Sequence, residues 1–165
     1  MLTHSAERLL PYSSEQLFDL AADVERYPEF LPGWFAAHVR KQEGQTYWTD
    51  QVIGLGPVRT RFASKTVLHR PERIDVTSEE PPFRRFKLTW LFRAGGNARC
   101  QVSLAAELEL QSYVLERIVA QALPAVVDDI VAAFEVRAGR LYGQPTFTSR
   151  PYDPKLPSSR GPACR

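Results

Sequence analysis

The chain has 165 residues, of which 44% are hydrophobic and 24% are charged, and its 21 basic and 19 acidic side chains give a formal net charge of +2. These proportions are typical of one soluble globular domain, and no apolar run approaches the roughly 20 residues of a membrane-spanning helix. The first residues have neither the apolar core of a signal peptide nor the acid-free, Arg-rich composition of a transit peptide. We therefore expect a cytoplasmic protein.

The composition of the chain changes after Gly143. Residues 144–165 contain five of the 13 prolines and almost no periodic apolar residues. Such a segment cannot bury enough surface to offset the entropy lost on ordering, so we expect a flexible tail there and one folded domain over residues 1–143. The tail carries four basic side chains and one acidic one, so the domain itself is close to neutral.

The first expected elements are a strand and a helix. Residues 3–10 predict the strand, which Pro11 closes. The helix follows because Ser13 is a favourable N-cap residue and Gln16 completes a capping box with it. An apolar face then continues until about Asp23, where we expect the helix to end.

The next segment, residues 24–35, is unusually aromatic. It contains two prolines, which prevent a long helix, so we predict a short helical turn or a loop. Tyr27, Phe30, Trp34 and Phe35 lie where no regular stripe requires them. Such residues suit the gating of a cavity, contact with a bilayer or docking of a partner, and the alternative is simple packing over one end of a sheet.

From residue 36 to residue 111 the chain follows a period of two. Apolar and polar residues alternate over residues 58–66, 86–92 and 99–110, and turn residues such as Gly, Pro and Asn separate the alternating runs. One apolar and one polar face predict an antiparallel sheet, and the short connections predict a meander.

The period then changes to 3.6 over residues 113–142, which predicts helix. We expect Pro124 to break or kink it, leaving a short helix to about Ala122 and a long one from there onward. This long helix is the element able to cover the apolar face of the sheet. The order of elements therefore predicts an α+β fold in which a curved sheet of about seven strands wraps around a long C-terminal helix.

The sequence carries no sign of catalysis or of a metal site. It has no nucleophile elbow, no phosphate-binding glycine loop and no zinc-protease motif, and its histidines and cysteines lack the spacing of metal ligands. Asp128 and Asp129 are adjacent on a helix, so their side chains point about 100° apart and cannot converge. The inward strand faces offer no acid, histidine or lysine for acid–base chemistry, so we predict no catalytic residues, no metal and no enzyme.

An apolar cavity is the site that remains. A sheet curved around one helix can enclose more volume than its side chains fill, and burial of a lipid contributes about 0.8 kcal/mol per CH₂ group. The alternative for each strand aromatic is a place in the plain core. The candidate lining residues are Phe62, Trp90, Phe92 and Phe134, and the candidate mouth residues are Tyr27, Phe30 and Trp34.

Basic residues form a possible second surface. Arg59, Arg61 and Lys65 share the polar face of one strand, and Arg84-Arg85 precedes another. Anionic lipid head groups or ribosomal RNA are ligands for such a stripe, and a solvated strand face is the alternative.

Several segments together resemble the coenzyme Q-binding START-like family, which has a helix-grip, polyketide cyclase-like fold and also contains RatA ribosome-association toxins. The resemblance spans about residues 3–143. The segments are Leu10-Pro11-Tyr12-Ser13, Gln16-Leu17-Phe18-Asp19-Leu20, Asp23-Val24-Glu25-Arg26-Tyr27-Pro28-Glu29-Phe30-Leu31-Pro32, Pro82-Phe83-Arg84-Arg85-Phe86, and Ala133-Phe134-Glu135 with Arg140-Leu141-Tyr142-Gly143.

This resemblance implies one of two functions. The first is non-enzymatic binding of ubiquinone or a related polyisoprenoid lipid, as a carrier or chaperone that supports respiration. It involves no cofactor and allows peripheral contact at the inner face of the membrane. The second is a RatA-like factor that binds the large ribosomal subunit and inhibits translation. The motifs of the two overlap, so the sequence leaves both open.

Overall fold

The computed structural model describes residues 1–55 and 57–143, and the expected flexible tail at residues 144–165 lies outside these residues. Within the described residues, no helix combines the length and the apolar character that crossing a membrane would require. In chain order the elements are β1 (Leu2–Leu10), α1 (Ser14–Ala22), the 3₁₀ helix η1 (Val24–Arg26), α2 (Tyr27–Phe30), β2 (Trp34–Glu43), β3 (Thr46–Leu55), β4 (Val58–His69), β5 (Arg73–Ser78), β6 (Phe83–Gly95), β7 (Arg99–Leu110) and α3 (Tyr113–Tyr142).

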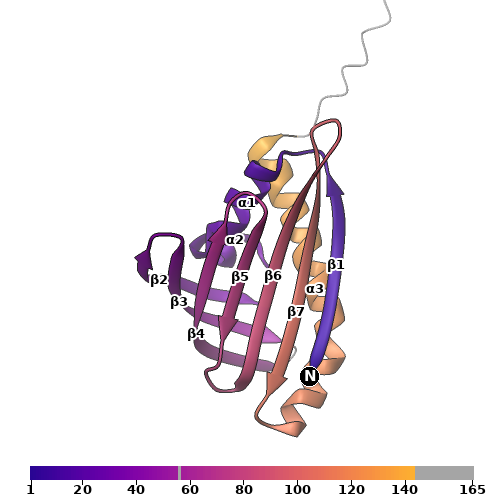
Figure 1. The fold of residues 1–165 in the computed structure, drawn as a ribbon. Helices are drawn as coiled ribbons and strands as arrows, with labels where there is room; N and C mark the ends of the chain where they lie inside the picture. The colour runs from indigo at the N-terminus through magenta and orange to yellow at the C-terminus, as the bar shows by residue number, and fades with distance from the viewer. Residues whose placement is uncertain (56, 144–165) are drawn as a thin grey trace, which may run out of the picture.

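The strands form one antiparallel sheet of seven strands. Its order is β1-β7-β6-β5-β4-β3-β2, so β2 to β7 form a meander and β1 pairs with β7 at the far edge. The sheet curves, and α3 lies along its concave face while α1 and α2 lie near one end (Figure 1). The predicted α+β fold, a curved sheet wrapped around a long C-terminal helix, is confirmed.

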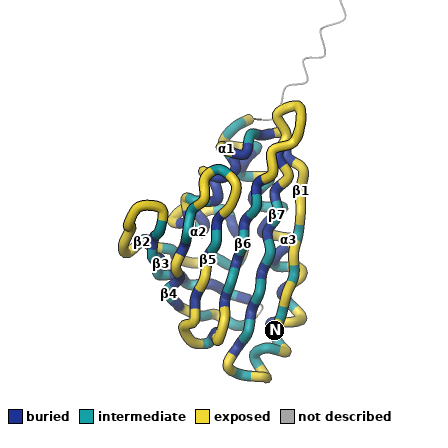
Figure 2. Tube along the Cα trace, in the orientation of Figure 1, coloured by how far each residue is buried: buried dark blue, intermediate teal, exposed yellow. Residues whose placement is uncertain are grey.

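The alternation read from the sequence corresponds to the two faces of the sheet. On β6, Phe86, Leu88, Trp90 and Phe92 are all buried, and on β7 every second residue from Cys100 to Leu110 is buried as well. The burial colouring shows this change from residue to residue along the strands (Figure 2). The inward residues of β6 and β7 therefore form the main wall of the core.

The start of α1 has the predicted capping box. Ser13 Oγ accepts a hydrogen bond from the backbone N–H of Gln16 at 3.2 Å, and the Gln16 side chain accepts one from the backbone N–H of Ser13 at 3.1 Å. A cap of this kind contributes about 1 kcal/mol to helix stability. It fixes where the helix begins, and thereby places the end of the helix, at Ala22, beside the sheet interior.

The prediction that Pro124 divides the C-terminal helix is wrong, because α3 continues through Pro124 without interruption. Proline lacks the N–H that would bond the carbonyl of Ala120, four residues earlier. Both Pro124 and Ala120 are exposed, so water can hydrate the freed carbonyl. The buried stripe on the opposite side of the helix then holds it on the sheet: Val119, Leu123, Val127, Ile130, Val131, Phe134 and Ala138.

A substitution at this position tests the continuity of α3. We expect Pro124→Ala to raise the free energy of unfolding by about 1–2 kcal/mol, because an interior helical proline costs more than the entropy it removes from the unfolded chain. Urea unfolding followed by circular dichroism measures the change, with the exposed substitution Gln121→Ala as the control. A loss of stability in Pro124→Ala would show that the chain turns at this residue.

Candidate functional site

Two adjoining cavities lie between the concave face of the sheet and the helices. Their volumes are about 390 Å³ for cavity 1 and about 370 Å³ for cavity 2, counting space open to solvent. Cavity 1 is lined by Ala21, Val24, Tyr27, Trp34, Tyr47, Gln51, Thr66, Ile74, Val76, Leu88, Trp90, Leu104 and Ile130. Cavity 2 is lined by Gly33, Trp34, Ile53, Gly54, Leu55, Phe86, Leu88, Ala106, Leu108, Leu123, Val126, Val127 and Ile130.

The two cavities differ in chemistry but share a boundary. Trp34, Leu88 and Ile130 line both, so a long ligand can extend from one into the other. Apart from two glycines, cavity 2 is lined by apolar side chains and the indole of Trp34, whereas cavity 1 also has the amide of Gln51 and the hydroxyl of Thr66. The combined space of the two cavities therefore has one partly polar end and one apolar end.

Both cavities are narrow. Only about 10 Å³ of cavity 1 and about 30 Å³ of cavity 2 admit the centre of a water molecule. One ordered water needs roughly 10–15 Å³ by this measure, so each space holds no more than a few waters. A lipid can enter only if part of the wall moves.

The short helical segment formed by η1 and α2, which we call the lid, forms part of the wall of cavity 1. Val24 and Tyr27 of the lid line cavity 1. The Tyr27 ring packs edge-on against Phe30, with ring centres 6.0 Å apart, and against Trp34 at 5.6 Å. The aromatic segment predicted from the sequence thus forms a short helical turn over one cavity.

Two tyrosine hydroxyls connect the lid and the sheet to the end of α1. Tyr27 Oη donates to the carbonyl of Ala21, and Tyr47 Oη donates to the carbonyl of Ala22 at 2.7 Å. These are carbonyls of the last helical turn, which have no partner within the helix. The two phenols therefore satisfy carbonyl groups at the end of α1. Tyr27 fixes the lid to α1, and Tyr47 fixes β3 to it.

Burial raises the pKa of both phenols well above the ordinary value of 10.0, with removal from water as the largest cause in each case. The neighbouring Tyr47 raises the pKa of Tyr27 further, and the charge of Asp23 acts on both phenols in the same direction. At neutral pH the two side chains therefore remain protonated hydrogen-bond donors, and neither supplies a base.

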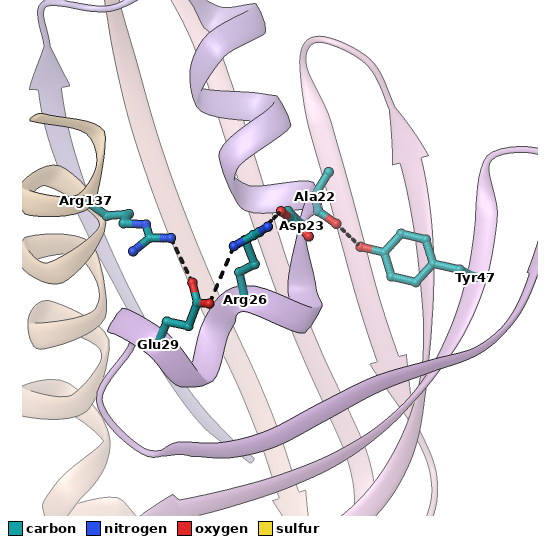
Figure 3. A network of polar contacts seen from close by, with 6 residues as sticks. All are labelled: Ala22, Asp23, Arg26, Glu29, Tyr47 and Arg137. Carbon is teal, nitrogen blue, oxygen red and sulfur yellow. Dashed lines mark hydrogen bonds and ion pairs between the residues drawn. The ribbon is translucent and has the colours of Figure 1, made fainter. Parts of the chain in front are cut away.

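Ion pairs link the lid to α3 (Figure 3). Glu29 accepts from Arg137 at 2.8 Å and lies 3.5 Å from Arg26, which also pairs with Asp23 at 3.1 Å. The Arg137 guanidinium lies 5.1 Å from the centre of the Phe30 ring. Because the lid residues of these pairs are about half exposed, each pair contributes at most about 1 kcal/mol. Aromatic packing, rather than charge, therefore holds the lid closed.

Gly33 joins the lid to β2, and the backbone at this position requires glycine. Its φ is +83°, and a Cβ atom there would lie 2.7 Å from the carbonyl oxygen of Gly54. The Gly33 carbonyl accepts from the N–H of Gly54 at 2.8 Å, so the two backbones are in direct contact. Any larger residue would push the end of β3 away and open cavity 2, which both glycines line.

The structure brings three of the predicted site residues together. Tyr27, Trp34 and Trp90 line cavity 1, and Trp34 lines cavity 2 as well. Phe30 lies in the lid, where it packs on Tyr27 and under Arg137 without lining either cavity. The predicted mouth residues Tyr27, Phe30 and Trp34 thus lie in the lid and at the start of β2.

The other three predicted residues are buried but do not line the two cavities. Phe62 packs against two phenylalanines, with ring centres 4.9 and 5.1 Å away, and Phe134 packs against Trp90 at 4.9 Å. Phe92 stacks with Trp90 at 6.2 Å. Phe92 and Phe134 therefore support the wall of cavity 1 from behind Trp90.

Sequence reasoning missed a group of buried polar side chains on the inward faces of β3 and β4. Trp34 Nε1 donates to Gln51 Oε1 at 2.8 Å, and Gln51 Nε2 donates to Ser64 Oγ. Thr49 Oγ1 is buried and has no hydrogen-bond partner among the described residues, which costs about 1–3 kcal/mol. Thr66 is buried beside them. The available signal was the alternation of inward and outward positions along residues 47–55. It was weak because each face of this strand carries polar as well as apolar residues.

Apart from the phenols of Tyr27 and Tyr47, the ionisable side chains of the described residues lie outside these cavities. His4 pairs with Asp128 at 3.2 Å and His38 pairs with Glu25 at 3.2 Å, both at the surface. Among the described residues no three His, Cys, Asp or Glu side chains are grouped closely enough to hold a metal ion. The cavities are therefore shaped for binding through apolar contact and a few hydrogen bonds.

Comparison with known proteins agrees with this architecture. The sequence profile of the family described as "Polyketide cyclase / dehydrase and lipid transport" matches residues 10–135. The chain belongs to this family. Among its relatives, the ribosome association toxin RatA of Pseudomonas aeruginosa is 31% identical over 144 residues, covering 87% of this chain and all of the toxin. The mitochondrial coenzyme Q-binding protein COQ10 homolog B of Xenopus laevis is 26% identical over 147 residues, covering 87% of this chain and 60% of that protein.

Solved structures of low identity show the same fold. The Zhui aromatase/cyclase of a Streptomyces species has a TM-score of 0.76 at 12% identity, covering 84% of this chain and 93% of that one. A START superfamily protein of Mycobacterium smegmatis has a TM-score of 0.74 at 13% identity, covering 84% and 98%. This polyketide cyclase family member therefore shares its helix-grip fold with both enzymes and START proteins.

The buried phenols predict an alkaline limit to stability. Above pH 10 the unfolded state loses phenolic protons that the folded state keeps, so the free energy of unfolding should fall by about 1.4 kcal/mol per pH unit for each buried tyrosine. Tyr47→Phe should make this decrease smaller by about 1.4 kcal/mol per pH unit, the contribution of one tyrosine. At pH 7 the same substitution should lower the free energy of unfolding by about 1 kcal/mol, because the hydrogen bond to Ala22 is lost. Urea unfolding between pH 7 and 11 measures both effects, and an unchanged slope would contradict the buried position of Tyr47.

Proposed function

We propose that this family member binds ubiquinone or a related polyisoprenoid lipid without catalysing a reaction, and acts as a carrier or chaperone that supports respiration. The observation that carries the proposal is the pair of adjoining, largely apolar cavities closed by an aromatic lid. The kinship with a coenzyme Q-binding protein gives the lipid its proposed identity.

The cavity linings favour binding over chemistry. They contain no carboxylate, imidazole or amine, and their phenols remain protonated at neutral pH. A cyclase or hydrolase needs a general acid or base whose pKa lies near the working pH. A binding protein needs only apolar surface, because each buried CH₂ equivalent contributes about 0.8 kcal/mol.

The closed state also fits a carrier. The free space in the cavities is narrow, and the ion pair that joins the lid to α3, Glu29 with Arg137, is weak. A polyisoprenoid is insoluble in water, so loading and release require contact with a bilayer. We therefore expect peripheral contact with the inner face of the membrane during exchange.

Filling cavity 2 tests the proposal. Ala106 lines this cavity from β7, and Ala105, its neighbour on the same strand, faces outward and is partly exposed. We expect Ala106→Leu to weaken loading of a short-chain ubiquinone at least about tenfold, because the added carbons occupy the space of the tail. Equilibrium dialysis with quantification of the quinone measures the loading.

Ala105→Leu provides the matched control, since it adds the same atoms to the opposite face of the same strand. It should load quinone as the unmodified protein does. Both variants are first compared by thermal unfolding, so that a lost fold is not taken for a lost site. Absence of quinone binding by the unmodified protein would remove the lipid function, and equal loading by the two variants would place the ligand outside cavity 2.

We infer a second candidate function, association with the large ribosomal subunit and inhibition of translation, from one surface feature. Arg59, Arg61 and Lys65 are exposed on the outer face of β4, with no carboxylate within 4 Å among the described residues. The Arg59 guanidinium lies 3.6 Å from the centre of the exposed Phe35 ring. Unpaired arginines beside an aromatic ring suit phosphate and base contacts. The RatA relatives support this reading.

Co-sedimentation with purified large subunits tests the second function. We expect the double substitution Arg59→Gln and Arg61→Gln to reduce association roughly tenfold at about 0.1 M salt, because phosphate contacts dominate such binding. Arg93→Gln with Arg99→Gln removes the same charge from β6 and β7 and serves as the control. If the unmodified protein did not associate with large subunits at low salt, this second function would be contradicted.

A further inference from the structure

The inward faces of β3 and β4 contain a cluster of buried polar side chains, which we call the polar patch: Thr49, Gln51, Ser64 and Thr66. None of them is more than 3% exposed. Thr49 pairs directly with Ser64 in the strand register, and Gln51 and Thr66 lie one inward position further along their own strands. The inward residues of β6 and β7, on the other side of the cavities, are apolar. The polar patch is therefore confined to one end of the combined space.

The orientation of the Gln51 amide is fixed by its neighbours. The indole N–H of Trp34 can only donate, so the atom it contacts at 2.8 Å must be the amide oxygen of Gln51. The amide NH₂ consequently points toward β4, where it donates to Ser64 Oγ. That group has two protons and Ser64 uses one of them. Gln51 therefore retains a hydrogen-bond donor at cavity 1, which it lines.

The polar patch is costly as a structural element. Thr49 Oγ1 is buried without a partner among the described residues. Valine has nearly the same shape as threonine and would remove that penalty, so packing alone does not account for the hydroxyl. Thr49 lines neither cavity, whereas its neighbours Gln51 and Thr66 line cavity 1, so these two side chains are the ones that offer hydrogen bonds to a ligand there.

The charges of the residues that line the cavities limit the chemical class of such a ligand. No Lys, Arg or His lines either cavity. A carboxylate or phosphate placed there would be buried without a counter-charge, which is strongly unfavourable. The amide N–H of Gln51 and the hydroxyl of Thr66 favour a neutral oxygen acceptor, such as a carbonyl.

We propose that the polar patch is a head-group site, in which Gln51 selects neutral lipids with a carbonyl head over hydrocarbons and over anionic lipids. This inference rests on the proposed lipid-binding function and deepens it. The head lies in cavity 1 beside Gln51, and the tail extends past Trp34, Leu88 and Ile130 into apolar cavity 2.

Three ligands with apolar tails of nine or ten carbons test the head-group site: decylbenzoquinone, decylbenzene and decanoate. Equilibrium dialysis with quantification by mass spectrometry measures each affinity. We expect the unmodified protein to bind the quinone roughly tenfold more tightly than decylbenzene, the effect of about one hydrogen bond, and to bind decanoate most weakly.

Gln51→Met keeps the length of the side chain and removes the amide. It should abolish the preference for the quinone while leaving decylbenzene affinity within about twofold. Gln101→Met is the matched control, because Gln101 is exposed on β7 and donates to Glu7 at 2.9 Å. Thr66→Val, a variant of nearly unchanged volume at the other patch residue that lines cavity 1, should also weaken the preference and replaces Gln51→Met if that variant does not fold.

The outcomes separate the two proposals. Equal binding of quinone and decylbenzene by the unmodified protein, tightest binding of decanoate, or an unchanged preference in folded patch variants would overturn the head-group site and leave lipid binding in place. Failure of all three ligands to bind would overturn the lipid function itself, and the head-group site with it.

Discussion

The packing of α3 against a curved sheet is the constraint on which the rest of the structure depends. One helix can follow only one line across a concave surface, and α3 follows the side formed by β1 and β7, to which it makes most of its contacts. Its buried stripe, from Val119 to Ala138, packs on that side. The helix contacts β3 far less than β1, so the inward faces of β3 and β4 need a further cover.

The lid, together with Trp34, provides that cover, and its energetics differ from those of a packed helix. A four-residue helix cannot be stable by itself, so α2 depends on the bond from the Tyr27 hydroxyl to the end of α1 and on edge-on packing of Tyr27 against Phe30 and Trp34. Gly33 then allows the chain to leave the lid in close contact with β3. A cover built from aromatic rings and half-exposed ion pairs can open at a small fraction of the cost of moving α3.

Sequence reasoning predicted the parts of this protein that local periodicity determines. The alternation of Phe86 to Phe92 predicted the core face of β6, and Ser13 with Gln16 predicted the start of α1. It failed at Pro124, where tertiary packing on the opposite face of the helix outweighed a local penalty. Periodicity also identified Phe62 and Phe134 as inward-facing, but whether an inward ring lines a cavity depends on the lateral position of α3, which no local pattern encodes.

The pleat of β4 gives the two candidate functions separate sets of side chains. Phe62, Ser64 and Thr66 face the interior, and Arg61 and Lys65 face outward between them. Substitutions at adjacent positions of one strand therefore reach opposite faces of the sheet, so an effect on lipid binding and an effect on ribosome association can be separated within a few residues. If one substitution on the outer face altered both, the cause would have to be the strand itself, because no outward side chain of β4 contacts the cavities.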